Sequence, residues 1–311
     1  MLKKLGKNWY LFGIAAAMGL AFLMPEASAA AKPAKSVAIF IAIFCMGYTA
    51  DPKGLLNAFR MPKGLIVGLL MVYLIAPALI YLADRLAFSP TAERDIYIGV
   101  ALIAAATTTV ATSIVYTKVA GGNHALAVAV SSFANILGVF VTPYLLKIML
   151  SANVSVDALG MVKKMIIFVL TPIVLGQIVR RFHVPSAKLS RGADILAQIT
   201  VLVMVFVSTG NAQKVINLAV VGKLAVVAAV CHGLVLLAGR GLGGVMRLSR
   251  EDAIAASFTG SQKTITTTTW LASEYFNPAA AIPIIVYHYV QLFIGHFFVQ
   301  SWGKEKEGGV E

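Results

Sequence analysis

The residue with the most unusual setting is Lys263, which lies in Ser257–Phe276, a stretch of about twenty residues that is long enough to span a membrane. No other charged residue occurs in this stretch before Glu274. An ammonium group at membrane depth is costly unless it is paired or hydrated. Lys263 is therefore either a buried cation that lines a polar cavity or a lysine that extends to the lipid headgroups. We favour the buried cation because the next basic residues, Arg250 and Lys304, are distant in sequence.

Small and hydroxyl-bearing residues surround this lysine. Gly260 and Ser261 precede it and Thr266–Thr269 follow it, which disfavours a continuous helix because glycine is flexible and hydroxyl groups compete for the backbone. We predict a broken helix at Ser261–Lys263 and a matching break at Ala104–Thr109. The candidate binding residues are the polar side chains near these breaks: Lys263, Gln262, Ser261, Thr264, Thr107, Thr108, Thr109, Ser113, Ser131, Ser132, Asn135, His288 and Gln291.

Composition indicates a polytopic membrane protein. The chain is 59% hydrophobic and 13% charged, whereas soluble domains carry roughly twice that charged fraction. The net charge of +13 agrees with basic cytoplasmic loops beside anionic lipid headgroups, and no basic-aromatic cluster indicates nucleic acid. HExxH, GxSxG and phosphate-binding glycine motifs are absent, so we expect neither an enzyme nor a cofactor. The lipid bilayer is the expected partner, and we expect a monomer.

Apolar runs predict an all-α fold with ten spans. The first, Trp9–Leu23, has an alternative interpretation, because residues 1–30 also resemble a cleavable signal peptide. We favour a retained helix because it makes the number of spans even. The other spans are Val37–Thr49 with an amphipathic continuation to Phe59, Leu65–Ala83, Ile96–Val119, Ala125–Leu150, Met161–Val179, Ile195–Thr209, Leu218–Val245, the lysine-bearing stretch from about Asp252, and Ala279–Trp302.

The two halves of the chain look alike. The segment ending at Lys63 resembles the segment ending at Lys223, and Asp95 corresponds to Asp252. Five spans in each half imply two inverted repeats, residues 1–150 and 151–311, whose broken helices would meet at the midplane. The alternative is ordinary packing of small residues between continuous helices. Placing both termini in the cytoplasm puts most lysines and arginines in inner loops.

Two motifs resemble those of the bile acid:sodium symporter superfamily. They are GGNHALAVAVSSFANILGVFVTP, at Gly121–Pro143, and SQKT, at Ser261–Thr264; the latter is similar to the sodium/bile acid cotransporter 7-like branch. The resemblance covers residues 9–302. It implies a panel domain of spans 1, 2, 6 and 7, and a core domain of spans 3–5 and 8–10 in which broken spans 4 and 9 cross. It also implies location in a bacterial inner membrane.

The same resemblance implies two sodium sites, which this chain retains only in part. Ser113 and Ser131 remain as weak candidates at the first site, and Gln262 remains at the second. Lys263 stands where the family usually has asparagine. The other positions expected to supply an oxygen ligand lack one: Ile114, Ala127, Phe258 and Leu69. Hard-cation sites need several oxygens, so we expect sodium coupling to be absent or reduced.

These observations favour secondary transport of an organic anion, bile-acid-like or a small carboxylate, by alternating access. Lys263 either replaces a bound sodium ion permanently or titrates during the cycle, since burial disfavours its charged form, and the coupling ion would then be a proton. One alternative is a sodium-coupled symporter of the usual family type. Another is a membrane regulator of ion homeostasis that does not transport.

Overall fold

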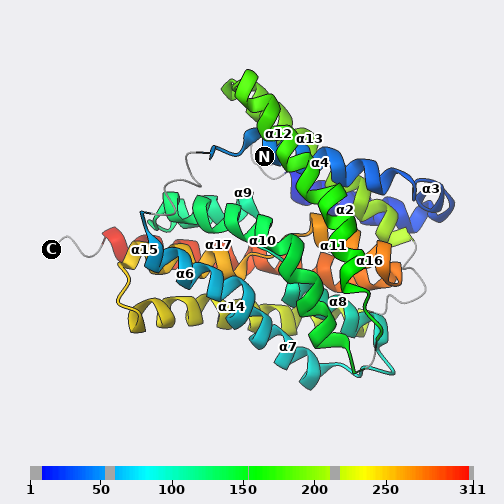
Figure 1. The fold of residues 1–311 in the computed structure, drawn as a ribbon. Coiled ribbons are helices and arrows are strands. Elements are labelled where there is room, and N and C mark those ends of the chain that lie inside the picture. Colours follow the sequence, from blue (N-terminus) through cyan, green and yellow to red (C-terminus); the bar gives the residue numbers. More distant parts are fainter. Residues whose placement is uncertain (1–8, 53–59, 153, 211–217, 308–311) are drawn as a thin grey trace.

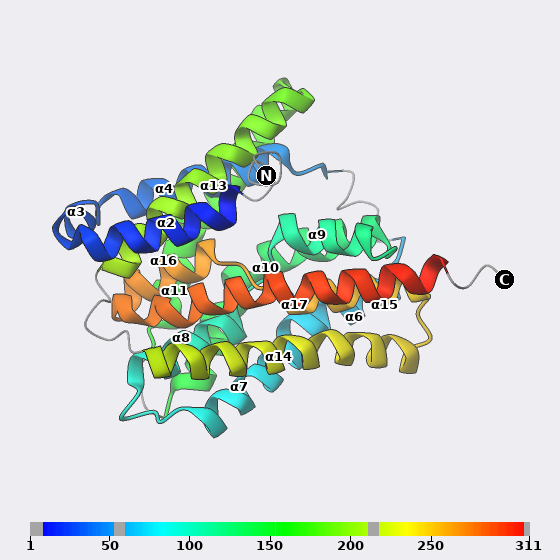
Figure 2. The ribbon, with the colours of Figure 1, turned by 180° about the vertical axis from the view of Figure 1, so that it is seen from behind.

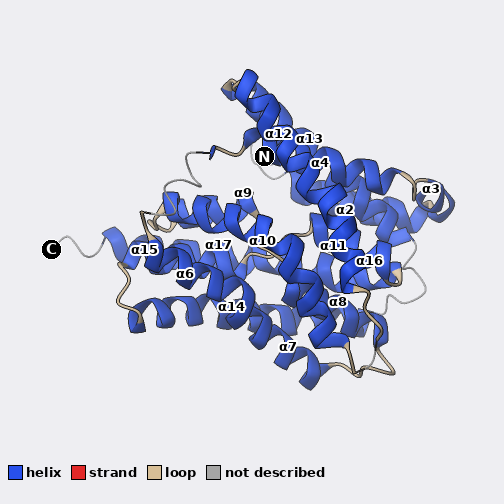
Figure 3. Cartoon of the chain, viewed as in Figure 1, coloured by secondary structure: helices blue, strands red, loops and turns tan. Residues whose placement is uncertain are grey.

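The computed structural model describes residues 9–52, 60–152, 154–210 and 218–307, and its regular structure is helical (Figure 3). By length and composition, six helices in this part of the chain can cross a membrane. They are Pro62–Ala87, His124–Leu150, Ala158–Phe182, Ala187–Gly210, Ala219–Val245 and Ala281–Gly303. Phe12–Leu23 and Ala34–Thr49 are apolar but shorter. The predicted class, an all-helical membrane protein, is confirmed.

The helices follow one another in the order drawn in Figure 1. They are α2 (Trp9–Leu23), α3 (Pro25–Ala30), α4 (Ala34–Thr49), α6 (Pro62–Leu70), the π-helix η1 (Met71–Ile75), α7 (Ala76–Ala87), α8 (Arg94–Ala105), α9 (Val110–Val119), α10 (His124–Leu150), α11 (Ala158–Met165), the π-helix η2 (Ile166–Leu170), α12 (Thr171–Phe182), α13 (Ala187–Gly210), α14 (Leu218–Val245), α15 (Arg250–Ser261), α16 (Thr266–Tyr275), the 3-10 helix η3 (Pro278–Ala280) and α17 (Ala281–Glu307). The predicted amphipathic continuation to Phe59 lies outside the described residues.

The third and sixth predicted spans each contain a proline, and both continue through it for the same physical reason. The third span runs through Pro77 without ending, because the π-helix η1 precedes the proline and shifts the hydrogen-bond pattern to i+5. The sixth span contains the same arrangement, with η2 just before Pro172. Both spans also extend a few residues beyond the predicted bounds at each end, to Pro62–Ala87 and Ala158–Phe182.

One group of helices comprises α2, α4, α12 and α13, which lie together in Figures 1 and 2. Here α4 packs against α12 and α13, and α13 also packs against α2. Gly47 and Gly176 allow α4 and α12 to touch, since a Cβ on Gly47 would lie 2.7 Å from the carbonyl oxygen of Ile173. Gln177 donates to the carbonyls of Gly47 and Ala50, at 2.6 and 2.8 Å, so α12 also caps the end of α4.

The second group holds α14 against α15 and α17, α7 against α8, and α10 against α9 and α15. Figure 2 shows α14 and α17 running side by side on the far face. The start of α15 is set by Ser249, whose Oγ accepts from the amide of Asp252 at 3.1 Å, with Glu251 and Asp252 in the first turn. This group contains both interrupted helices.

Candidate functional site

Two helix interruptions meet in the interior of the second group. The first separates α8 from α9 and the second separates α15 from α16. Thr108 and Lys263 form an isolated antiparallel bridge between them. The amide of Thr109 donates to Gln262 O at 2.9 Å, and the amide of Thr264 donates to Thr107 O at 3.0 Å. The predicted interruptions of both spans are confirmed, and short extended segments satisfy each other's backbone groups.

Gln291 of α17 holds the peptide at Lys263 in place. Its Oε1 accepts from the Lys263 amide at 2.7 Å, and its Nε2 donates to the Lys263 carbonyl at 3.0 Å. His288, one turn earlier, places Nδ1 2.9 Å from Gln291 Nε2 and lies edge-on to Tyr10 of α2. The carbonyl of Ser261 lies 3.2 Å from Nδ1 of His232. The structure therefore places His288, Gln291, Ser261 and Lys263, all candidates from the sequence, close to one another.

The side chain of Lys263 points into the protein and is 3% exposed. Its Nζ donates to the carbonyl oxygens of Val72 at 3.1 Å and Ala106 at 3.0 Å. The interpretation that Lys263 is a buried cation agrees with this position. The expectation that it lines a polar cavity does not, because its ammonium group lies between η1 and the end of α8.

The break in the fourth span is tied to α10 through Asn135. The hydroxyl of Thr107 donates to Asn135 Oδ1 at 2.9 Å, and Asn135 Nδ2 donates to Thr108 O at 3.1 Å. The same Nδ2 reaches Ser131 O at 2.8 Å. Because Asn135 also faces a cavity, it connects the break to space that a ligand can occupy.

The three weak sodium candidates fall into two groups. Ser113 and Ser131 are buried, with their hydroxyl oxygens 3.2 Å apart. Gln262 instead accepts from the hydroxyl of Thr112 at 3.1 Å and donates to Gln291 O at 3.3 Å. Thr112 was not among the predicted candidates, although it contacts one of them and lies in the same hydroxyl-rich segment.

Aromatic packing occupies the place where the resemblance implies a carboxylate. Phe258 is fully buried, with its ring centroid 5.9 Å from that of Tyr116 and 5.4 Å from that of Trp302. Ala127 is also fully buried. Both side chains are apolar and buried, so they pack closely against neighbouring helices and offer no oxygen to an ion.

A cavity of about 420 Å³ lies between the two groups of helices, within the range of small-molecule sites. Its wall consists of residues from α4, α9, α10, η2 and α12: Met46, Gly47, Ala50, Val110, Ser132, Asn135, Ile136, Leu170, Ile173, Val174, Gln177, Ile178 and Arg181. Ser132 and Asn135 were predicted. Gln177 and Arg181 were missed, although a basic pair at the end of an apolar span is a visible signal.

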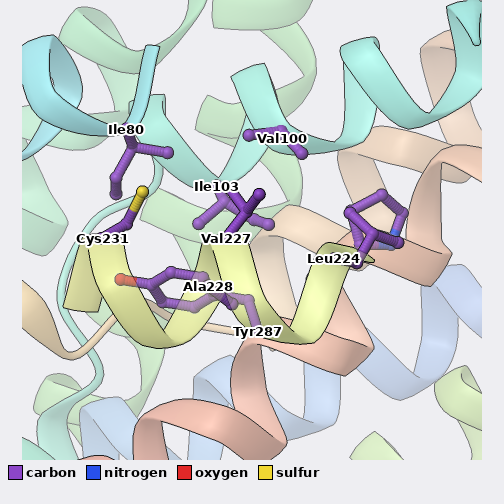
Figure 4. A pocket seen from close by; sticks show the side chains of 9 residues that line it. Ile80, Val100, Ile103, Leu224, Val227, Ala228, Cys231 and Tyr287 are labelled. Atoms are coloured by element: carbon purple, nitrogen blue, oxygen red, sulfur yellow. The ribbon is translucent and has the colours of Figure 1, made fainter. Parts of the chain in front are cut away.

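A second cavity, shown in Figure 4, is of a different kind. It encloses about 10 Å³, roughly the space for the centre of one water molecule. Its wall is mostly apolar and includes Ile80, Cys231 and Tyr287. It is too small for an organic substrate, so the larger cavity is the candidate binding site.

Interrupted helices that meet inside a bundle of apolar helices, beside a cavity between two packed groups, define the architecture of a membrane transporter. The chain belongs to the SBF-like CPA transporter family, whose model matches residues 8–304. It is thus an integral membrane protein of the bile acid:sodium symporter kind, as its motifs predict.

Several relatives support this assignment. The uncharacterized protein PA2026 of Pseudomonas aeruginosa is 30% identical over 243 residues, covering 74% of this chain and 72% of that protein. Sodium/bile acid cotransporter 7 of Mus musculus is 24% identical over 100% of this chain and 98% of its own length. The uncharacterized sodium-dependent transporter YocS of Bacillus subtilis is 26% identical over 86% of this chain and 83% of its own.

Proposed function

We propose that this protein is a secondary active transporter that moves an amphipathic organic anion by alternating access. The observation that carries the proposal is the cavity between the two helix groups, because Asn135 and Val110 connect its wall to the crossing breaks. Movement of one group against the other would change the access to this cavity. The groups correspond to a panel (spans 1, 2, 6 and 7) and a core (spans 3–5 and 8–10).

The proposed architecture is ten spans in two inverted repeats, residues 1–150 and 151–311. Two features support it. Each half contains one helix interrupted near its middle, and each half contains a π-helical segment just before a proline. With five spans per half, both termini lie on the cytoplasmic side, in agreement with the distribution of basic residues.

The chemistry of the cavity indicates the substrate class. Most wall residues are apolar, including Met46, Ile136 and Ile173, so they suit a hydrocarbon body. Arg181 supplies a cation and Gln177 an amide at the end where α12 leaves the bundle. An anionic group beside Arg181 and an apolar body against α10 would satisfy both. The printed names of two kinds of relative, sodium/bile acid cotransporter 7 and YocS, are compatible with such a substrate.

Contacts at the α11 end of the sixth span, away from Arg181, support a state in which the cavity is closed on the α11 side. Lys164 of α11 pairs with Glu274 of α16, and Tyr275 donates to Gly160 O at 2.9 Å. Lys164 also lies 5.2 Å from the centroid of the Tyr275 ring. These contacts join the two helix groups on the side away from Arg181, so the cavity would exchange its substrate on the Arg181 side.

We further propose that sodium coupling is absent or reduced. A free cation within about 4 Å of the charged Lys263 would be repelled by about 4 kcal/mol at an effective dielectric constant near 20. That is roughly a thousandfold in affinity if nothing compensates for it. The buried Phe258 and Ala127 add no side-chain oxygen.

The test is uptake of labelled cholate, benzoate and citrate by the purified protein in proteoliposomes. Ile136→Trp fills the cavity wall and should reduce uptake of the accepted anion at least tenfold. Ile148→Trp is the matched control on the same helix, because Ile148 is 72% exposed on the outer surface, and it should retain activity. Transport of cations alone, or full anion uptake by Ile136→Trp, would contradict the proposal.

A further inference from the structure

The Lys263 ammonium group occupies a position where two main-chain carbonyls have lost their ordinary donors. In η1 the amide of Ala76 donates to Met71 O, one residue further back than in an α-helix. Continuing that i+5 pattern would make residue 77 the donor to Val72 O. Residue 77 is proline and has no N–H. Val72 O therefore receives Lys263 Nζ, at 3.1 Å, in place of a helical donor.

The second carbonyl is freed by the break in the fourth span. Ala106 is the first residue after α8 and is extended, with φ −65° and ψ 146°, so its carbonyl leaves the helical pattern. The preceding carbonyl, Ala105 O, accepts from the hydroxyl of Thr142 at 2.8 Å, and Ala106 O accepts from Lys263 Nζ at 3.0 Å. Both lie at the carboxyl end of α8, where the helix dipole favours a positive charge.

A close approach of α15 to η1 directs the lysine to this place. A Cβ on Gly260 would lie 2.6 Å from the Cβ of Met71, so the absence of a side chain allows the two segments to touch. Lys263 follows Gly260 by three residues, and its side chain enters between η1 and α8. Both acceptors are neutral oxygens whose dipoles balance the ammonium charge, which is how carbonyl sites hold monovalent cations.

We propose that the carbonyls of Val72 and Ala106 form a monovalent-cation site, and that Lys263 fills it as a covalently attached alkylammonium ion. The site joins the third span to both breaks, so its cation holds the crossing together. The consequence for transport rests on the proposed function: a cation that is part of the chain stays bound through the cycle and requires no ion gradient. The existence of the site does not depend on what the protein transports.

The experiment uses chemical replacement in full-length Lys263→Ala, made by cell-free synthesis into nanodiscs. This variant lacks Cγ, Cδ, Cε and Nζ, which together correspond to n-propylammonium. We expect n-propylammonium chloride to raise the folded yield of Lys263→Ala, and to raise its Tm saturably by about 5 °C or more. Tetramethylammonium, which has no N–H, and neutral 1-propanol should have no such effect. Wild type and Lys147→Ala, which loses an exposed lysine of α10, should not respond.

A second variant keeps the test decisive. Lys263→Met retains the apolar part of the side chain but leaves both carbonyls without the ammonium group, so its Tm should fall and n-propylammonium should not restore it. The proposal is overturned if Lys263→Met is as stable as wild type. It is also overturned if n-propylammonium gives Lys263→Ala neither a higher folded yield nor a higher Tm than tetramethylammonium. If the wild-type protein takes up no anion, that result contradicts the proposed function but not the cation site, because the site does not depend on what the protein transports.

Discussion

At the scale of single residues, the crossing depends on polar groups that satisfy one another without water. The interrupted helices leave amides and carbonyls free inside the bundle, where each unpaired group costs about 1–3 kcal/mol. Gln291 pairs with both the amide and the carbonyl of Lys263, and Asn135 pairs with Thr108 O. An extended backbone at this depth is stable because these side chains replace the missing helical partners.

Gln291→Leu should therefore destabilise the protein strongly. The substitution preserves side-chain size but leaves the Lys263 amide and carbonyl without their partner, so we expect a loss of about 2 kcal/mol or more. Denaturant unfolding in detergent, or Tm, measures the change. The matched control is Gln300→Leu, because Gln300 is exposed on the same helix and contacts only His296 among the bonds described. Equal stability of the two variants would contradict this role for Gln291.

At the scale of elements, the position of the breaks was predictable and the π-helices were not. Gly260, Ser261 and Thr266–Thr269 weaken the helix locally, and the stretch carries no charge other than Lys263 before Glu274, so the sequence alone locates the interruption. The ends of α2 and α14 also agree with the predicted spans. The π-helix η1 depends on i+5 bonding, which periodicity does not reveal, although Pro77 in the middle of a span was a signal.

The direction of the Lys263 side chain could not be predicted from sequence for a related reason. It depends on the contact between α15 and η1, which brings together segments far apart in the chain. The same holds for Gln177 and Arg181, which face the cavity only because α12 packs against α4. Residue types identified Lys263, Ser132 and Asn135 as candidates, but only tertiary packing separates the residues of the ion site from those of the cavity.

Gly260→Ala tests the close approach of these elements. The new methyl group would meet Met71 and force α15 away from η1, so we expect a loss of about 1–3 kcal/mol. Gly233→Ala on α14 is the control, because a Cβ there would have no other atom within 4 Å and alanine favours a helix. The Tm of both variants gives the comparison. A Gly260→Ala protein at least as stable as Gly233→Ala would show that the contact does not constrain the fold.

At the scale of the whole molecule, the two helix groups have different interiors and different expected roles. The group of α2, α4, α12 and α13 is fastened by a glycine contact and by capping of α4, which suits a rigid support. The other group contains the interruptions and the buried ammonium. The cavity lies where the groups face each other, and the proposed relative movement of the groups would expose it on alternate sides.

We propose that an organic anion moves through this cavity without loading a sodium ion, because the Lys263 ammonium group already fills the cation position at the crossing. The most direct measurement is the initial rate of labelled cholate exchange in proteoliposomes that contain equal concentrations of sodium, potassium or N-methylglucamine chloride. We expect rates within about twofold of one another for wild type, and little exchange for Ile136→Trp, because a charged Lys263 would repel a sodium ion about 4 Å away by about 4 kcal/mol, roughly a thousandfold in affinity. Exchange that requires sodium and saturates with it in the millimolar range would contradict the claim.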